Sequence, residues 1–380
     1  MVVEKLSSNI DIETHLKELG VDGGGISILS AKAKSHIISI KDLNVGGANI
    51  LKQDALSIGA DLAVPKGTVL ATTPKVDTLL IATTAQLKTL ARKELAQPFG
   101  LKELALKLKE ISSVKKAQSV QVMGIINAND DSFFSGSRFS QGDAIEKIEL
   151  MIDEGATIID IGGVSSAPNT QSVSVDKELA RVKPILDTIK TRELFKRVAF
   201  SIDSYEPKVI EYALRSGFQI VNDITGLESD EVCRLCAKYN AKVVIMHMQG
   251  NPQTMQDNPT YVNILDEVYS FFKERVAKAE SFGIKEIVLD VGIGFGKTLE
   301  DNLKLIKHLE HFRSLSKELL VGASRKSMIG QIDNSPIEER LAGSLSAHLE
   351  SIRNGASIVR VHDVKEHIQA IKVQMALDEV

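Results

Sequence analysis

The most informative pattern along the chain is a unit that occurs eight times between residues 119 and 362. Each unit has a short run of β-branched and other apolar residues, then a polar or Gly-rich tip, and then an amphipathic helical stretch. Strands that alternate with helices predict a parallel sheet, and eight such units predict a closed (β/α)8 barrel. We expect its strands near 119–124, 157–161, 198–202, 220–221, 242–246, 287–289, 319–322 and 358–361.

A polar or ionisable residue follows each predicted barrel strand. The carboxyl ends of barrel strands meet on one face, where the active sites of this fold lie. The sequence therefore predicts a functional site at that face. The residues at the eight tips are Asn127, Asp160, Asp203, Asn222, His247, Asp290, Ser324-Arg325-Lys326 and Arg360-Val361-His362.

Residues 1–115 are predicted to form a small α/β extension, and residues 116–380 the barrel. Within the extension we expect strands at 25–29, 36–40, 62–64, 68–72 and 78–81 and helices at 48–58, 85–96 and 101–111. Its predicted strands do not end in a cluster of ionisable residues. A structural or partner-binding role is therefore favoured over a second active site.

The composition is that of an ordinary globular protein, with 43% hydrophobic and 25% charged residues and a net charge of −4. It lacks the basic excess of a general nucleic-acid binder, so an anionic substrate would have to meet local cations. The first residues contain no apolar leader segment, and no run of 18 uncharged apolar residues follows. We therefore expect a cytoplasmic protein without a membrane partner.

Cys233 and Cys236 form a C-x-x-C pair, a spacing that occurs in metal and redox sites. They lie within a helical pattern, and no second Cys pair or nearby His completes a tetrahedral set. We expect both to be reduced thiols in the core.

The Gly-rich segment 292–298 resembles a nucleotide-binding loop but fits neither common template. A Walker A loop requires Gly at the position of Val291, and the dinucleotide fingerprint requires G-x-G-x-x-G where this chain has G-x-G-x-G. The glycines still allow the backbone to approach a ligand closely beside Asp290.

Asp203, Asn222 and Asp290 each follow a β-branched strand directly. Two carboxylates and a carboxamide suit a heterocycle with amidine-like N–H donors, although any one of them could instead cap the next helix. Lys326 and Arg360 supply cations at the last two strands, together with Arg325 and His362, and this is the usual phosphate end of the fold. Surface ion pairing is the alternative for each cation.

With these residues identified, the sequence closely resembles dihydropteroate synthase over residues 119–364. The motifs that carry the resemblance follow in the family's order. They are Met123-Gly-Ile-Ile-Asn127-Ala-Asn-Asp-Asp131-Ser-Phe133, Ile158-Ile-Asp-Ile-Gly-Gly163, Ser201-Ile-Asp203-Ser-Tyr205, Val221-Asn222-Asp223-Ile224, Met246-His247, Asp290-Val-Gly-Ile-Gly-Phe295, Ser324-Arg-Lys326-Ser327 and Arg360-Val-His362.

The resemblance implies that 6-hydroxymethyl-7,8-dihydropterin diphosphate condenses with p-aminobenzoate to give dihydropteroate and pyrophosphate, with Mg²⁺ as cofactor, in a homodimer. It also implies a role for each matching residue. The pterin pocket corresponds to Asp203, Asn222, Asp290 and Lys326, with Met246 and Arg360 as its walls. The pyrophosphate end corresponds to Arg360, Val361 and His362, and the p-aminobenzoate and loop-two contacts correspond to Phe295, Ser327 and Ser166. The Mg²⁺ ligand corresponds to Asn127, and the group that stabilises developing positive charge corresponds to Asp131.

The second loop departs from the family pattern, because Val164-Ser165-Ser166-Ala167-Pro168 stands where Glu-Ser-Thr-Arg-Pro is usual. The loop's arginine is thus absent. Three other functions share parts of the pattern. A pterin-binding methyltransferase needs the pterin residues but no pyrophosphate clamp, a Schiff-base aldolase would use Lys326 as nucleophile, and a pterin-binding protein without catalysis would need the pocket alone.

Overall fold

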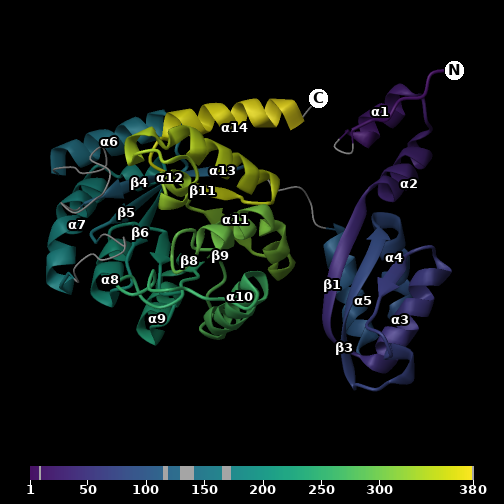
Figure 1. Cartoon of the computed structure of the whole chain (residues 1–380). Coiled ribbons are helices and arrows are strands. Elements are labelled where there is room, and N and C mark those ends of the chain that lie inside the picture. The colour runs from purple at the N-terminus through teal and green to yellow at the C-terminus, as the bar shows by residue number, and fades with distance from the viewer. Residues whose placement is uncertain (8–9, 114–118, 129–140, 165–172, 379–380) are drawn as a thin grey trace. The chain divides into compact units, whose positions relative to one another are not determined.

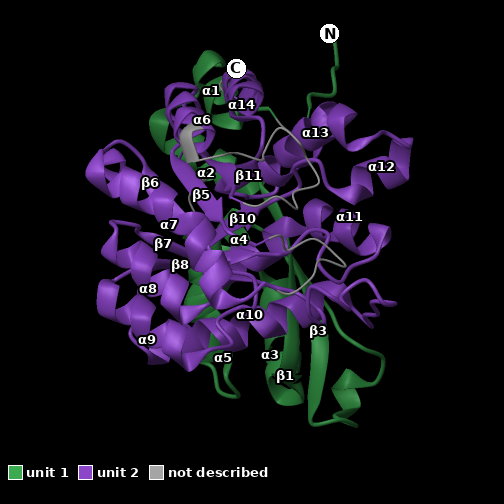
Figure 2. Cartoon of the chain, turned by 90° about the vertical axis from the view of Figure 1, so that its left-hand side faces the viewer, with its two compact units in different colours: residues 1–116, 380 green, residues 117–379 purple. Residues whose placement is uncertain are grey.

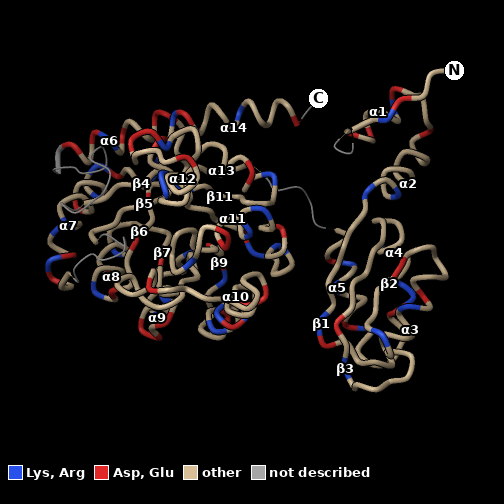
Figure 3. Tube along the Cα trace, in the orientation of Figure 1, with Lys and Arg blue, Asp and Glu red and all other residues tan. Residues whose placement is uncertain are grey.

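The computed structural model describes residues 1–7, 10–113, 119–128, 141–164 and 173–378. The chain divides into two compact units, residues 1–116 and 117–379, which Figure 2 shows in different colours. Figure 3 shows Lys and Arg interspersed with Asp and Glu along both units. None of the helices in the described part of the chain combines the length and the apolar composition that spanning a bilayer requires.

Eight parallel strands of the second unit close into a barrel, as the repeated sequence unit predicts (Figure 1). They follow one another around the barrel in chain order, and the last strand pairs with the first. The (β/α)8 prediction is confirmed. The strands are β4 (Gln121–Asn127), β5 (Ile158–Gly162), β6 (Ala199–Asp203), β7 (Ile220–Asp223), β8 (Lys242–Met246), β9 (Ile287–Asp290), β10 (Glu318–Val321) and β11 (Ile358–Val361).

Helices surround the barrel. The helix that begins at Leu299 ends at Lys307 and is followed by a 3₁₀ segment, Leu309–Leu315. A capping box begins this helix, since Thr298 and Asp301 exchange side-chain and backbone hydrogen bonds. The helices are α6 (Gln141–Asp153), α7 (Val175–Thr191), α8 (Pro207–Arg215), α9 (Asp230–Tyr239), α10 (Ile264–Ser281), α11 (Leu299–Lys307), α12 (Ser327–Asp333), α13 (Leu341–Arg353) and α14 (Val364–Asp378), with 3₁₀ segments η3 (Leu194–Lys196), η4 (Leu309–Leu315) and η5 (Ile337–Glu339).

Side chains alternate along each barrel strand between the interior and the layer under the helices. In β11, Ile358 packs in the interior cluster with Met123 and Val244, whereas Val359 and Val361 belong to the larger cluster between sheet and helices. This alternation decides which residue at each strand end faces the mouth of the barrel.

The first unit is a three-stranded antiparallel sheet in the order β1-β3-β2. Its core contains Leu51, Leu80 and Leu87, all fully buried. Two expected strands are wrong: 25–29 lies inside a helix, and 68–72 begins with a 3₁₀ turn. The elements are α1 (Ile12–Glu18), α2 (Gly23–Ala33), β1 (Ser35–Asn44), α3 (Val45–Ser57), β2 (Asp61–Ala63), η1 (Thr68–Leu70), β3 (Lys75–Thr83), α4 (Thr84–Glu94) and α5 (Leu101–Ser113).

Cys233 and Cys236 are free thiols that lie fully buried on α9. Burial raises the pKa of Cys236 to about 12, which makes this thiol a poor metal ligand at neutral pH. The expectation of core thiols is confirmed.

We expect the double variant Cys233→Ala, Cys236→Ala to retain turnover within about twofold while losing about 1–2 kcal/mol of unfolding free energy, because it removes packing and the weak bond from the Cys233 thiol to Leu227 O at 4.0 Å. Activity, urea unfolding and zinc content check this. Stoichiometric zinc in the parent, or a folded variant without turnover, would contradict it.

Candidate active site

Polar side chains from four strands meet inside the carboxyl end of the barrel. Arg360 of β11 lies at their centre, donating from Nε to Asp160 Oδ2 at 2.6 Å and from Nη2 to Asp203 Oδ2 at 2.7 Å. Asn222 of β7 donates from Nδ2 to the same Asp160 oxygen at 3.1 Å. One guanidinium therefore links β11 with β5 and β6, and the predicted residues Asp203, Asn222 and Arg360 lie together.

Burial dominates the electrostatics of this cluster. It raises the pKa of Asp203 to about 7, although Arg360 opposes the shift. Burial also raises the pKa of Asp290, whose Oδ1 accepts the Gly292 N–H at 2.8 Å. Both groups hold their charge less firmly than exposed aspartates, so a ligand that donates hydrogen bonds would stabilise their ionised forms.

Two buried oxygens at the mouth have no hydrogen-bond partner among the described residues: Asp160 Oδ1 and Ser201 Oγ. These residues are cross-strand neighbours, on β5 and β6. Because Asn222 uses its amide nitrogen on Asp160, its oxygen is the group left to accept from a ligand. The mouth thus presents an excess of acceptors.

Lys326 and Phe295 form a second group at the mouth. The Lys326 Nζ lies 4.2 Å from the centre of the Phe295 ring, and burial, aided by Arg360, lowers the lysine pKa to about 8. Phe295 packs with Met246 and Ile224. Predicted pterin-pocket and p-aminobenzoate residues are therefore in contact, although they come from β8, the loop after β9 and the loop after β10.

The loop 291–297 requires its glycines. Gly292 has a φ of +66°, and a Cβ there would lie 2.0 Å from the carbonyl oxygen of His247. Lys297 holds the loop from beneath, since its buried Nζ donates to His247 O at 3.1 Å and to Phe295 O at 2.9 Å. Burial lowers the pKa of Lys297 to about 7. The sequence alone predicts no role for Lys297, because segment 292–298 matches neither nucleotide-binding motif.

His247 does not face the mouth. Strand alternation turns Met246 inward and His247 outward, where its ring meets Phe271 of α10 edge-on with centroids 5.0 Å apart. Burial lowers the pKa of His247 to about 3. The expectation that all eight strand tips converge is therefore wrong at this position.

The remaining predicted residues lie in varied surroundings. Asn127 ends β4 and is half-buried, and Ser327 is exposed at the start of α12. The Val361 side chain packs in the layer under the helices, so a ligand would meet its backbone. Asp131 and Ser166 lie outside the described residues.

His362 is neutral near pH 7, because burial and Arg360 lower its pKa to about 3. Its Nδ1 lies 2.9 Å from Ser324 Oγ, which also accepts the His362 backbone N–H at 3.2 Å. The interpretation of His362 as a cation is corrected here: it can act as a neutral hydrogen-bonding group.

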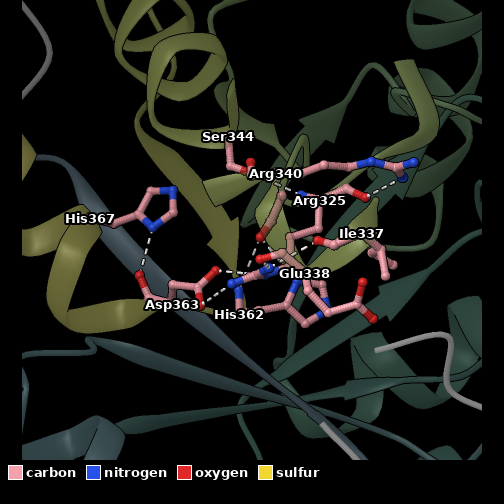
Figure 4. A network of polar contacts seen from close by, with 9 residues as sticks. Arg325, Ile337, Glu338, Arg340, Ser344, His362, Asp363 and His367 are labelled. Carbon is pink, nitrogen blue, oxygen red and sulfur yellow. Dashed lines mark hydrogen bonds and ion pairs between the residues drawn. The ribbon is translucent and has the colours of Figure 1, made fainter. Parts of the chain in front are cut away.

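Arg325 forms a buried ion pair. Its guanidinium donates twice to Asp363, at 2.9 and 2.8 Å, and to the carbonyl oxygens of Ile337 and Glu338 at 2.9 and 2.8 Å (Figure 4). Of the expected cations, Arg325 is therefore used to join loops rather than to meet a ligand.

Metal ligands are few. Among the described residues, no group of three or more His, Cys, Asp or Glu side chains could hold a metal ion. Mg²⁺ in phosphate-transfer sites is commonly held by one or two protein oxygens together with substrate phosphates. The amide oxygen of Asn127 fits such a shared site, and the described donors do not fit a site made by protein alone.

Residues 123–362 match the family model described as "Pterin binding enzyme". A bifunctional dihydropteroate synthase/dihydropteroate reductase of Helicobacter pylori is 41% identical over 379 residues, covering 100% of both chains. The dihydropteroate synthase of Escherichia coli is 44% identical over 255 residues, or 66% of this chain and 89% of that protein.

Solved structures of dihydropteroate synthases are also similar to this chain. A Yersinia pestis dihydropteroate synthase with a sulfonamide drug complex has a TM-score of 0.66 at 37% identity, covering 69% of this chain and 95% of the other. The Thermus thermophilus enzyme in complex with 4-aminobenzoate has a TM-score of 0.61 at 33% identity, covering 68% and 95%.

The closed barrel, the polar site at its mouth and the family match together define a pterin-binding enzyme built on a (β/α)8 barrel. Within that class, the chain belongs to the dihydropteroate synthase family, whose members are transferases of folate biosynthesis. This assignment favours the synthase over the methyltransferase, aldolase and non-catalytic alternatives.

Proposed function

We propose that the barrel mouth condenses 6-hydroxymethyl-7,8-dihydropterin diphosphate with p-aminobenzoate to give dihydropteroate and pyrophosphate. The observation that carries the assignment to this site is the set of buried acceptors beside two cations. Asp203, Asn222 and Asp290 supply the acceptors, and Arg360 and Lys326 supply the charges. An amine-bearing heterocycle with a diphosphate tail matches that distribution.

The pterin ring would bind between the three acceptors. Asp203 and Asp290 would accept ring N–H groups, and the amide oxygen of Asn222 would accept a third. Met246 supplies an apolar wall, since it is 2% exposed and faces inward. Arg360 already donates to Asp203, so the ring would take over that acceptor and free part of the guanidinium for the diphosphate.

The amine substrate would lie on the Lys326 and Phe295 side. Phe295 offers its ring face to an aromatic substrate, and Lys326, 4.2 Å above that ring, offers charge to a carboxylate. Ser327 follows directly and is exposed. Ser166, which follows β5 in the sequence, is proposed to contact substrate on this side, and Asp131, which follows β4 in the sequence, to stabilise the developing positive charge.

The leaving group would depart toward Arg360 and His362. In our proposal the exocyclic C–O bond breaks first, pyrophosphate carries away the electron pair, and the ring supports the resulting cation. The amine nitrogen then forms the new C–N bond and loses a proton. Arg360 would pair with the departing charge, and neutral His362 and the Val361 backbone would donate hydrogen bonds to it.

Mg²⁺ is the cofactor we propose, held by Asn127 together with diphosphate oxygens. When bound, it would neutralise charge on the leaving group.

The assignment is tested by p-aminobenzoate-dependent pyrophosphate release. We expect release from pterin diphosphate only with the amine present at steady state, in equal amount to dihydropteroate. Pyrophosphate release without dihydropteroate, or methyl transfer instead, would contradict the proposal.

Turnover at limiting pterin diphosphate should be highest between about pH 7 and pH 8. As pH falls through about 7, Asp203 gains a proton and loses an acceptor, and as pH rises through about 8, Lys326 loses its charge. A pH profile of kcat/KM checks this. In Asp203→Asn the fall of kcat/KM at acid pH should disappear. If that fall remains unchanged in the variant, it belongs to the titration of another group.

Lys326 is expected to act as a hydrogen-bonding cation. Its lowered pKa would also suit a Schiff-base lysine, so the two roles need a chemical test. Borohydride added during turnover should leave the protein mass unchanged. A reduced adduct at Lys326 would restore the aldolase alternative.

We also propose a homodimer in the cytoplasm, on the family resemblance. Light scattering at micromolar concentration should give twice the chain mass of 41.4 kDa.

A second activity is proposed because the Helicobacter pylori relative, whose name includes dihydropteroate reductase, aligns along the whole chain, including residues 1–116. The activity would add a hydride and a proton to the dihydropterin ring of the product. Product reduction should occur with a nicotinamide or reduced flavin donor and be absent from the Escherichia coli relative, which matches only 66% of this chain. No consumption of either donor would reject it.

A further inference from the structure

Two buried histidines lie behind the mouth of the barrel and have no part in the chemistry above. His348 of α13 and His367 of α14 are each 1% exposed. His348 Nδ1 lies 2.8 Å from His367 Nε2, and the ring centroids are 4.9 Å apart. The pair therefore joins two helices at a point sealed from solvent.

The hydrogen bonds fix the proton positions on both rings. The Ala323 backbone N–H donates to His348 Nε2 at 2.9 Å, so that nitrogen carries no proton and Nδ1 must donate to His367. His367 Nε2 is then an acceptor, and its Nδ1 donates to the carbonyl oxygen of Asp363 at 2.6 Å. Adding a proton to either ring would place two donors face to face. Burial lowers the pKa of both histidines, in agreement with a neutral pair.

The two ends of this chain of bonds lie next to the segments that carry the active-site cations, Lys326 in the loop after β10 and Arg360 on β11. Ala323 begins the segment that leads to Lys326, and Asp363 follows His362. The loops are joined a second time by the Arg325 to Asp363 ion pair, in which both distances are below 3.0 Å (Figure 4).

The Lys326 loop needs this support, because Arg325 has a φ of +55°, which is unfavourable for a side chain larger than glycine. Ser344 Oγ accepts the Arg325 backbone N–H at 2.8 Å. Ser344 lies one turn before His348, so a single buried face of α13 holds both Ala323 and Arg325.

We propose that His348 is a positioning residue, which holds the Lys326 loop on α13 by accepting the Ala323 backbone N–H, while the bond to His367 fixes the tautomer of the His348 ring. It would thereby set the distance between the cation on the amine side and the groups on the pyrophosphate side. Both ends of the chain are backbone groups, so the pair transmits geometry rather than protons. The inference rests on the proposed function of the mouth.

Two substitutions of His348 separate positioning from packing. In His348→Gln the amide reaches the place of Nε2 and can still accept from Ala323, while the bond to His367 is lost. In His348→Asn the amide reaches only the place of Nδ1, keeps the bond to His367 and leaves the Ala323 N–H unpaired. Each variant loses one hydrogen bond, so the midpoint temperature of thermal denaturation should fall by similar amounts in the two variants.

We expect kcat/KM to fall about 10- to 100-fold in His348→Asn and to stay within about threefold of the parent in His348→Gln, because only the former releases the loop. Amide exchange at residues 323–326 should accelerate in His348→Asn alone. Equal kinetics and equal exchange in the two variants, both folded, would overturn the proposal.

Amide exchange also distinguishes this inference from the proposed function. A parent protein that releases no pyrophosphate would refute the function of the mouth. The exchange rates of residues 323–326 would then still decide whether His348 holds the loop.

Discussion

Asp203→Asn is expected to lower kcat/KM for the pterin diphosphate by roughly 100- to 1,000-fold, because a buried charged acceptor is removed from a desolvated site. The substitution also replaces one of the two carboxylate oxygens by an amide donor, and it removes the negative charge that faces the Arg360 Nη2 at 2.7 Å. Steady-state kinetics with the pterin diphosphate varied at saturating p-aminobenzoate measure the effect.

A matched control is Asp153→Asn, since Asp153 makes an exposed ion pair with Arg197 and its side chain is 71% accessible. That variant should keep kcat/KM within about twofold of the parent. Equal activity in Asp203→Asn and Asp153→Asn would remove Asp203 from the pterin site.

Arg360→Met is expected to abolish most turnover and to cost about 3–5 kcal/mol of unfolding free energy near pH 8, because Asp160 and Asp203 are left as unpaired buried carboxylates. Arg360 holds the Asp203 pKa down, so its loss raises that pKa further. When the pKa of a carboxyl group is higher in the folded state than in the unfolded state, the unfolding free energy of the protein decreases as the pH rises between those two values.

The stability deficit of Arg360→Met should therefore shrink as pH falls from 8 toward 5, where Asp203 binds a proton in the folded protein. Arg360→Lys, which keeps the charge but loses the fork, should show a smaller deficit. Urea unfolding at several pH values measures both variants. If Arg360→Met and Arg360→Lys lose the same unfolding free energy at every pH, the charge of Arg360 does not determine its contribution to stability.

The barrel could be predicted from sequence because eight β-branched runs alternate with amphipathic helices at regular intervals. The identities of inward residues at the strand ends were harder to predict. Met246 and His247 both stand at the tip of β8, and only the strand register shows that His247 turns toward Phe271. A one-residue error in a strand end exchanges the two faces.

Residues that act from behind the site left no sequence signal. His348 and His367 are separated by 19 positions along the chain, and Lys297 reaches back 50 positions to the carbonyl oxygen of His247. Such contacts depend on how helices pack, which local patterns do not encode. In the first unit, the strand expected over 25–29 was wrong because a run of apolar residues this short does not separate strand from helix.

The proposed function requires the pterin ring to bind among Asp203, Asn222 and Asp290 in the barrel mouth. A crystal structure with the pterin diphosphate and Mg²⁺, without p-aminobenzoate, tests it most directly. We predict ring nitrogens within hydrogen-bond distance of all three side chains, Arg360 partly withdrawn from Asp203, and phosphate oxygens beside Arg360 and His362. A ring bound elsewhere, with the Arg360 to Asp203 ion pair intact, would contradict it.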